Sequence, residues 1–134
     1  MNYLLDTCIL SLFARGNQAV LMRLKQTPPA SIRLSVITLM EIEYGFALNS
    51  HKIDRLSPVI NALINAVQIL DYDQKSASAT AKIRAELRTK GIPIGPYDSL
   101  LGGVALAHKL TMVTANVSEF QRIDGLKVED WSKL

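Results

Sequence analysis

The stretch Tyr3-Leu4-Leu5-Asp6-Thr7 decides the fold, because it joins a short apolar run, a carboxylate and the start of a helical pattern. The apolar run predicts a buried strand, and the pattern over Thr7–Arg15 predicts a helix that Gly16 closes. The same order returns at Ile32–Ile37, a predicted strand, and Thr38–Leu48, a predicted helix. Strands that alternate with helices pair in parallel through right-handed crossovers. We therefore predict an α/β sandwich around a short, mainly parallel sheet.

The rest of the chain continues this alternation. Further helices are expected at Lys52–Ala66, Gln74–Lys90 and Tyr97–Lys109, and further strands at Val67–Leu70, Met112–Thr114 and Lys127–Val128. The segment Gly91–Pro96 contains two glycines and two prolines, which exclude regular structure there. No repeat, low-complexity tract or linker divides the chain, so we expect a single domain over residues 1–134.

Composition excludes several classes of protein. With 49% hydrophobic and 20% charged residues, the 134-residue chain is not expected to be globally disordered. Its single cysteine, Cys8, excludes an intramolecular disulfide and a multi-cysteine zinc site, and it favours a reducing cytoplasm. No apolar stretch approaches the roughly 20 residues that span a bilayer. Asp6 comes early and the first basic residue is Arg15, which argues against a secretory signal.

Positive charge is concentrated in one predicted helix. The net charge of +3 is too small to name a polyanionic partner. A helical period places Arg84 and Arg88 on one side of this helix and Lys75 and Lys82 on another, with an apolar stripe between them. This pattern is typical of a solvated helix face, but it also suits a rim that contacts phosphates beside an active centre. Between residues 74 and 91 a single acid, Glu86, stands against five bases: Lys75, Lys82, Arg84, Arg88 and Lys90.

Polar side chains recur just after the predicted strands, where ligands bind in open α/β sheets. Some of them have a purely structural explanation. Thr38-x-x-Glu41 fits a capping box, and Asn116-x-x-Glu119 fits the same role more loosely. Asp98 suits the first turn of a helix. A carboxylate at Asp6 is harder to explain in this way, because burial next to a strand is costly without a cation. The candidate site residues are Asp6, Glu41, Asp98, Asn116 and Glu119.

If Asp6, Glu41 and Asp98 converge, their mutual repulsion raises their pKa values unless a divalent cation keeps them ionised. Ligands that are all oxygen favour Mg²⁺ or Mn²⁺ over zinc. His51 and His108 lack the spacing of metal ligands and are expected on or near the surface. A carboxylate-bound Mg²⁺ beside a basic rim indicates phosphate chemistry.

The chain resembles the PIN-domain ribonucleases, and among them the VapC toxins of type II toxin–antitoxin systems. Together the motifs that carry the resemblance span the chain from its first strand to Trp131, and they are more specific than any one of them alone. The Pro93–Pro96 segment looks like the VapC branch that cuts initiator tRNA in its anticodon loop. The matching segments are Tyr3–Thr7, Ser35–Gly45, Gly91–Asp98, Val113–Phe120 and Gly125–Trp131.

The resemblance implies a three-layer α/β/α sandwich and a Mg²⁺-dependent, toxic endoribonuclease that leaves a 5′-phosphate. It places the metal on Asp6 and Asp98, with Glu41 as the third acid. The fourth position, often aspartate in the family, is Asn116 here, and Glu119 could compensate for the missing charge. Glu43 is about 200° around the helix from Glu41, so we leave it outside the site.

The resemblance also implies partners. They are a second copy of the chain and a small VapB antitoxin whose tail enters the acidic groove, with promoter DNA bound only through the antitoxin. Apolar Leu10, Leu12 and Phe13 could serve the antitoxin contact or the core, and we expect the core.

Two departures and two other functions stay open. Cys8 stands where the family commonly has Asn or Ser, either as inert packing or as an oxidation-sensitive thiol. Gly102 and Gly103 allow close packing but lower helix propensity by about 1 kcal/mol each. A PIN-like chain without chemistry could act as a binding partner or co-repressor of an antitoxin. An aspartyl phosphatase of the haloacid dehalogenase type is disfavoured, since its second aspartate would fall on Cys8.

Overall fold

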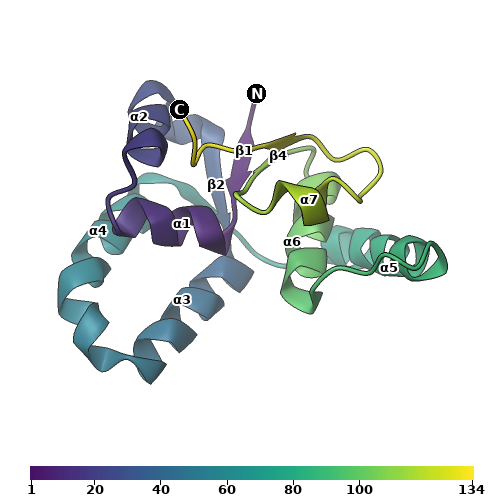
Figure 1. The fold of residues 1–134 in the computed structure, drawn as a ribbon, viewed down its shortest axis with the longest axis horizontal. Coiled ribbons are helices and arrows are strands. Elements are labelled where there is room, and N and C mark those ends of the chain that lie inside the picture. Colours follow the sequence, from purple (N-terminus) through teal and green to yellow (C-terminus); the bar gives the residue numbers. More distant parts are fainter.

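The computed structural model describes all 134 residues and has a five-stranded sheet at its centre (Figure 1). The strand order is β3-β2-β1-β4-β5, and all four neighbouring pairs are parallel. The chain builds outward from β1 to one side and then returns to the other, so the order reverses between β1 and β4. Ligands bind at such a switch point in open parallel sheets. The strands are β1 (Tyr3–Leu5), β2 (Ile32–Ser35), β3 (Gln68–Leu70), β4 (Thr111–Val113) and β5 (Val128–Glu129).

Helices cover both faces of the sheet, as the burial of parallel strands requires (Figure 1). The arrangement confirms the predicted three-layer α/β/α sandwich. None of the helices combines the length and the apolar character that crossing a bilayer requires. The α-helices are α1 (Thr7–Ala14), α2 (Gln18–Gln26), α3 (Val36–Leu48), α4 (Ile53–Ala66), α5 (Gln74–Thr89), α6 (Pro96–Ala107) and α7 (Val117–Phe120), with short 3₁₀ turns at Pro29–Ser31 and Ser50–Lys52.

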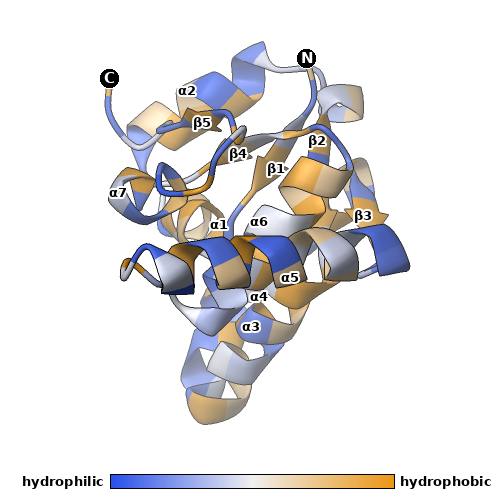
Figure 2. Cartoon of the chain, turned by 90° about the vertical axis from the view of Figure 1, so that its right-hand side faces the viewer, coloured by the Kyte–Doolittle hydropathy of each residue, from blue (hydrophilic) through white to orange (hydrophobic).

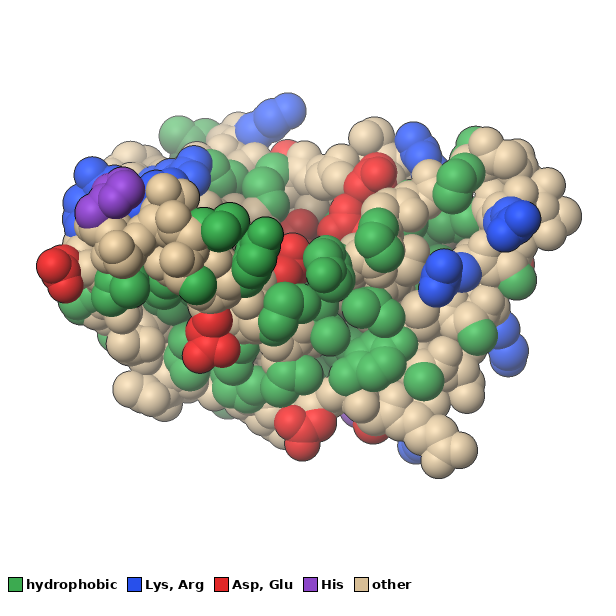
Figure 3. All heavy atoms as spheres, turned by 90° about the horizontal axis from the view of Figure 1, so that it is seen from below, with side chains coloured by type: hydrophobic (Ala, Val, Ile, Leu, Met, Phe, Trp, Pro, Cys, Tyr) green, Lys and Arg blue, Asp and Glu red, His purple; other side chains and the backbone are tan.

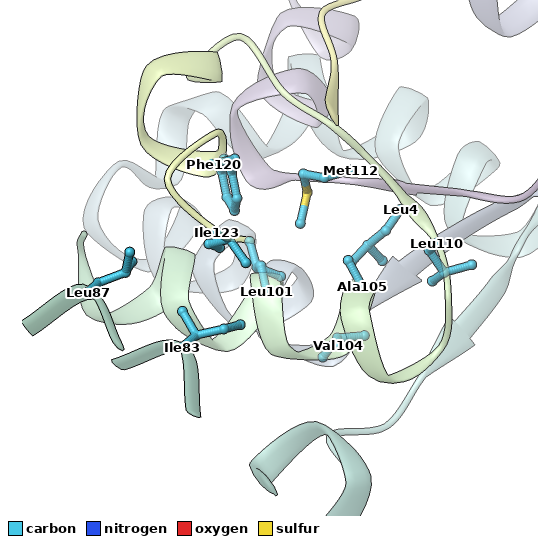
Figure 4. Close-up of a cluster of buried hydrophobic side chains, with 10 residues drawn as sticks. All are labelled: Leu4, Ile83, Leu87, Leu101, Val104, Ala105, Leu110, Met112, Phe120 and Ile123. Atoms are coloured by element: carbon cyan, nitrogen blue, oxygen red, sulfur yellow. The ribbon is translucent and has the colours of Figure 1, made fainter. Parts of the chain in front are cut away.

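Two hydrophobic clusters lie on opposite faces of the sheet. Leu4 points into one and Leu5 into the other, because successive side chains of a strand alternate between faces. The first cluster joins the sheet to α5, α6 and α7 (Figure 4), and the second joins it to α1, α2 and α4. Figure 2 shows hydrophilic residues along the outer side of α5. Leu10 is buried, and Leu12 and Phe13 pack against the second cluster, so the core interpretation of these residues is confirmed.

Some element boundaries differ from the sequence prediction. β2 ends at Ser35 and α3 begins at Val36, because the Ser35 Oγ accepts a hydrogen bond from the Ile37 N–H (3.0 Å) and caps the helix. The capping box of Thr38 and Glu41 is therefore wrong, since both residues lie inside α3. The termini of β4 and β5 are displaced by one residue from the expected ones.

The sequence analysis missed α2. Its apolar residues are mixed with polar ones without a clear stripe, and only Ala19 and Val20 are buried. Its start is nevertheless marked, because the Asn17 Oδ1 accepts a hydrogen bond from the Val20 N–H (3.0 Å) directly after Gly16. Reading Asn17 as a helix cap would have found this element.

The glycine pair of α6 lets α5 approach closely, as expected. A Cβ at Gly103 would overlap the Thr80 Oγ1 and lie 2.8 Å from the backbone oxygen of Ser76. At Gly102 a Cβ would lie 2.6 Å from the Ile123 Cδ1. The contacts at Gly103 hold α6, and with it Asp98, close against the basic helix.

Candidate active site

Asp6 occupies the centre of the sheet's carboxyl edge. It directly follows β1 and is only 3% exposed. Its Oδ1 accepts a hydrogen bond from the Ile9 N–H (2.8 Å) and caps α1, while its Oδ2 accepts one from the Thr114 hydroxyl after β4 (2.5 Å). Burial raises the pKa of Asp6 to about 6 against these two hydrogen bonds, and the charge of Glu41 adds to the rise. Asp6 thus caps α1 with one carboxyl oxygen, and hydrogen bonds fix its carboxyl group at the switch point of the sheet.

Glu41 reaches the same edge from α3. It is half-buried, and its Oε1 accepts a hydrogen bond from the Thr7 hydroxyl (2.6 Å) at the start of α1. The buried Thr38 lies one turn earlier, with its hydroxyl 3.3 Å from that of Thr7. Glu43 is exposed, as expected of a residue outside the site.

Asp98 and Glu119 form a carboxyl pair on the other side of Asp6. Asp98 lies in the first turn of α6 and is half-buried. Burial, the contact with Glu119 and the charges of Asp6 and Glu41 raise its pKa to about 7. The contact with Asp98 lowers the pKa of Glu119, and Asn116 and Arg122 lower it further. The two carboxyl groups therefore oppose each other's ionisation, and the pKa of Asp98 carries the rise.

Asn116 links the pair through its side-chain amide. Its Nδ2 donates to the Glu119 Oε2 (2.5 Å) and, more weakly, to the Asp98 Oδ2 (3.4 Å). Although Asn116 stands at the start of α7, its side chain makes no capping hydrogen bond, so the looser capping-box interpretation is wrong. The residue carries no charge but orients two carboxyl groups.

The structure thus brings Asp6, Glu41 and Asp98 into electrostatic range of one another, with Asn116 and Glu119 beside them. In Figure 1 the strands run downward, and Figure 3 shows acidic side chains in the middle of this lower face with apolar ones around them. All donors are oxygens, as Mg²⁺ and Mn²⁺ prefer, and the mutual repulsion is what a cation would relieve. No group of three or more acids, histidines or cysteines already stands at metal-binding distance, so a cation would draw the carboxylates together.

Asp130 is a further acid near the site that the sequence analysis missed. It directly follows β5, and its charge raises the pKa of both Asp6 and Cys8. The predicted last strand ended at Val128, one residue early, so the rule that pointed to Asp6 falls there on Glu129 and not on Asp130. Cys8 is exposed, yet the partial desolvation of its thiol and the charges of the nearby acids raise the pKa of that thiol, which makes it a poor nucleophile.

The basic residues of α5 divide as predicted. Arg84 and Arg88 line a hollow of about 490 Å³, and Lys75 and Lys82 line a separate one of about 570 Å³. The apolar stripe between them, Ile83 and Leu87, is buried.

The two histidines lie away from the acidic edge. His108 is half-buried, and its Nε2 bonds to the Asp73 Oδ2 (2.9 Å) at the start of α5. His51 is exposed. Neither joins a group that could bind a metal.

A parallel sheet with acids gathered at its switch point defines the class of this protein, and the model of the PIN domain family matches residues 3–126. The tRNA(fMet)-specific endonuclease VapC of Salmonella typhimurium is 46% identical over 98 residues, which cover 73% of this chain and 74% of the relative. The protein of the same name from Shigella flexneri is 36% identical over 98% of this chain and 99% of its own. The chain therefore belongs to the VapC family of PIN-domain toxins.

Solved structures agree with this assignment. The DNA-bound VapBC of Salmonella typhimurium contains a chain that is 37% identical, with a TM-score of 0.88 and 98% of both chains covered. The VapBC2 of Rickettsia felis, bound to a DNA fragment from its promoter, gives a TM-score of 0.89 at 29% identity, with 98% of this chain and 99% of that one covered.

Proposed function

We propose that this chain is a toxic endoribonuclease that hydrolyses RNA phosphodiester bonds and that a VapB-type antitoxin neutralises it. One observation carries the proposal: four carboxyl groups, Asp6, Glu41, Asp98 and Glu119, lie within electrostatic range of one another at the switch point of a PIN fold, and the pKa of Asp6 and of Asp98 is raised above its ordinary value. Such a group of acids lowers the stability of the fold through mutual repulsion, so its presence indicates a functional site. The similarity to proteins named as ribonucleases supports the same conclusion.

The residues fit a divalent cation, Mg²⁺ or Mn²⁺, held by Asp6 and Asp98 with Glu41 as the third acid. When bound, such a cation lowers the pKa of a water and neutralises charge on the phosphoryl oxygens. Thr114 and Thr7 orient the Asp6 and Glu41 carboxylates through hydrogen bonds of 2.5 and 2.6 Å. This support resembles the outer hydrogen bonds that fix ligating carboxylates in metal sites.

Asn116 and Glu119 complete the catalytic group. Asn116 keeps Glu119 turned toward Asp98. When Asp98 is ionised, its carboxylate and that of Glu119 lie side by side. Together they would attract a cation or accept hydrogen bonds from a water. In the proposed reaction, water hydrolyses the RNA phosphodiester bond directly, and no covalent enzyme intermediate forms.

The substrate we propose is tRNA, cut in the anticodon loop of the initiator. Two relatives named as tRNA(fMet)-specific endonucleases support this choice. Arg84 and Arg88 are exposed on α5 and are proposed to contact RNA phosphates. Replacing both with Gln should flatten the dependence of log binding constant on log salt by up to about two charges. An unchanged slope would remove this role.

The partners we propose follow the solved relatives. VapBC complexes, some on DNA, support an antitoxin that binds this chain and connects it to promoter DNA. A homodimer is proposed as well, and a monomeric mass at micromolar concentration would count against it.

Cleavage of total tRNA tests the function directly. The purified protein is incubated with tRNA with and without Mg²⁺, and new ends are mapped by primer extension. We expect one discrete, metal-dependent cut that Asp6→Asn lacks and that Asp73→Asn, the same change at a distant cap, retains. No cut in any preparation would favour the non-catalytic partner of an antitoxin, whose binding would then be measured.

A further inference from the structure

We infer that the hollow beside α5 is a subsite for one unstacked nucleotide of the RNA chain, next to the bond that is cut. The inference rests on the proposed function, because it concerns the same substrate. The hollow has a volume of about 490 Å³, within the range of small-ligand sites. It lies between the second half of α5 and the segment before α6. The side chains that shape it are Arg84, Arg88, Pro93, Ile94, Pro96 and Ser99.

The charge of this hollow suits a phosphate. Arg84 and Arg88 are exposed, neither forms an ion pair with an acid of the chain, and no carboxylate lines the hollow. The hollow on the other side of α5 differs, because Glu86 and Asp124 line it together with its lysines. Of these two basic hollows on α5, only the arginine one offers unopposed positive charge to a polyanion.

The position of the hollow ties it to the acidic edge. Ser99 and Pro96 line it, and Asp98 lies between them in the same turn of α6. Arg122 connects the two places, since its Nη1 donates to the Pro93 oxygen (3.0 Å) while its charge lowers the pKa of Glu119. A nucleotide in the hollow would therefore lie beside the turn of α6 that carries Asp98.

The uncharged residues that line the hollow suit a nucleic-acid base. Pro93, Ile94 and Pro96 offer apolar surface, and arginine guanidinium groups stack on bases. Ser99 is not expected to form a hydrogen bond with the base, because it is buried and its hydroxyl already donates to the Gly95 oxygen (3.0 Å). The hollow therefore holds a base by stacking and burial, and depends on the presence of a base more than on which base it is.

A cycle of RNA and protein changes tests the subsite. Once the cut is mapped, RNA stem-loops containing it are made with a single abasic nucleotide at each position up to two residues on either side. For the native protein we expect one position where loss of the base lowers kcat/KM by about tenfold, as stacked bases do. Ile94→Ala should lower kcat/KM on the intact RNA and lose its sensitivity to that one position. Arg88→Gln should weaken cleavage of every RNA.

The matched control is Lys82→Gln, which removes a charge from the same helix on its other face. It should keep the full sensitivity to the missing base, and circular dichroism melts confirm that each variant folds. Equal cleavage of all abasic RNAs, or undiminished sensitivity in Ile94→Ala, would overturn the subsite. If those variants change only the mass in solution, the hollow belongs to a contact between copies, which also overturns it.

Failure of the proposed function gives a different pattern. If the native protein cuts no RNA, anticodon stem-loops of initiator tRNA with a single abasic nucleotide at each loop position are compared with the intact stem-loop by fluorescence anisotropy. The subsite then predicts weaker binding of one abasic RNA to the native chain and equal binding of all RNAs to Ile94→Ala. Equal binding by the native chain would overturn it.

Discussion

Asp6 and Asp73 cap two different helices with the same hydrogen bond, yet their acidities differ by several orders of magnitude. Each accepts a bond of 2.8 Å from the backbone N–H three residues later, that of Ile9 in one case and Ser76 in the other. The pKa of Asp6 is raised to about 6, whereas that of Asp73 is lowered to about 2. The cap itself therefore does not decide the acidity of either residue.

The surroundings decide it. Asp6 is buried and faces other acids, and burial is the largest cause of its raised pKa. Asp73 lies near the surface, where its contact with Ser76, whose N–H donates to it, and the ring of His108 favour its charge. The lowered pKa of Asp73 fits a helix cap that serves the structure alone, while the raised pKa of Asp6 fits a residue kept for chemistry.

The largest effect that can test this comparison is on cleavage. Asp6→Asn keeps the cap but removes the negative charge, so RNA cleavage should fall by about a thousandfold or more, since a metal site supplies several kcal/mol to the transition state. Initial rates on the mapped tRNA measure it. Asp73→Asn makes the same chemical change at the other cap and should leave the rate within about twofold. Similar losses in both variants would show that the cap, not the charge at the sheet edge, is what matters.

Stability should move in the opposite direction to activity. The pKa of Asp6 is higher in the folded chain than its value of 3.8 elsewhere, so this group stabilises the fold at low pH and that contribution disappears as pH rises through about 6. At pH 7, Asp6→Asn should therefore increase the free energy of unfolding by about 1 to 3 kcal/mol. Urea unfolding measures it.

The pH dependence sharpens the same prediction. Between pH 4 and 6 the native chain should lose stability relative to Asp6→Asn, and above pH 7 the difference should be constant. A variant that is less stable than the native chain at pH 7 would show that the Asp6 carboxylate contributes to the fold and is not strained.

A divalent cation should offset part of the destabilisation that the ionised Asp6 carboxylate causes. At ten times its dissociation constant, Mn²⁺ or Mg²⁺ should stabilise the native chain by about 1.4 kcal/mol, which a thermal melt detects without any RNA. Asp73→Asn should keep the whole shift and Asp98→Asn should lose most of it. An equal shift in all three proteins would place the cation elsewhere.

The sequence predicted where Asp6 lies in the fold, because the signals for that position are local. An apolar run followed by Asp6 indicates a strand and the residue at its carboxyl end, and the alternation of strands and helices brings such residues to one edge. Asp98 and Asn116 were candidates from their positions in the chain, and the resemblance to a family then gave each of them a role. Asp130 obeys the same local rule but follows a strand of only two residues, which is too short to give a clear pattern.

Other features depended on tertiary structure. Ser35, not Thr38, caps α3, because the strand before it ends where its pairing with β3 stops. The pairing of Asp73 with His108 joins residues 35 apart that only the packing of α5 on α6 brings together. The acidities of Asp6 and Asp73 could not be predicted from sequence either, since both residues match the same capping pattern.

The smallest effect we predict concerns this second cap. Asp73→Asn keeps an oxygen for the Ser76 N–H but replaces the charge that faces His108, so the melting temperature at pH 6 should fall by less than Asp6→Asn raises it at pH 7. Because the pKa of Asp73 is lowered, its contribution is present above pH 4 and disappears as pH falls toward about 2. The native chain and the variant should therefore converge in stability at that acidity. Replacing His108 with Gln, in the native chain and in Asp73→Asn, separates the contact with His108 from the cap. If Asp73→Asn lowers the melting temperature equally with and without His108, the two side chains are not coupled. The lowered pKa of Asp73 would then come from the helix start alone.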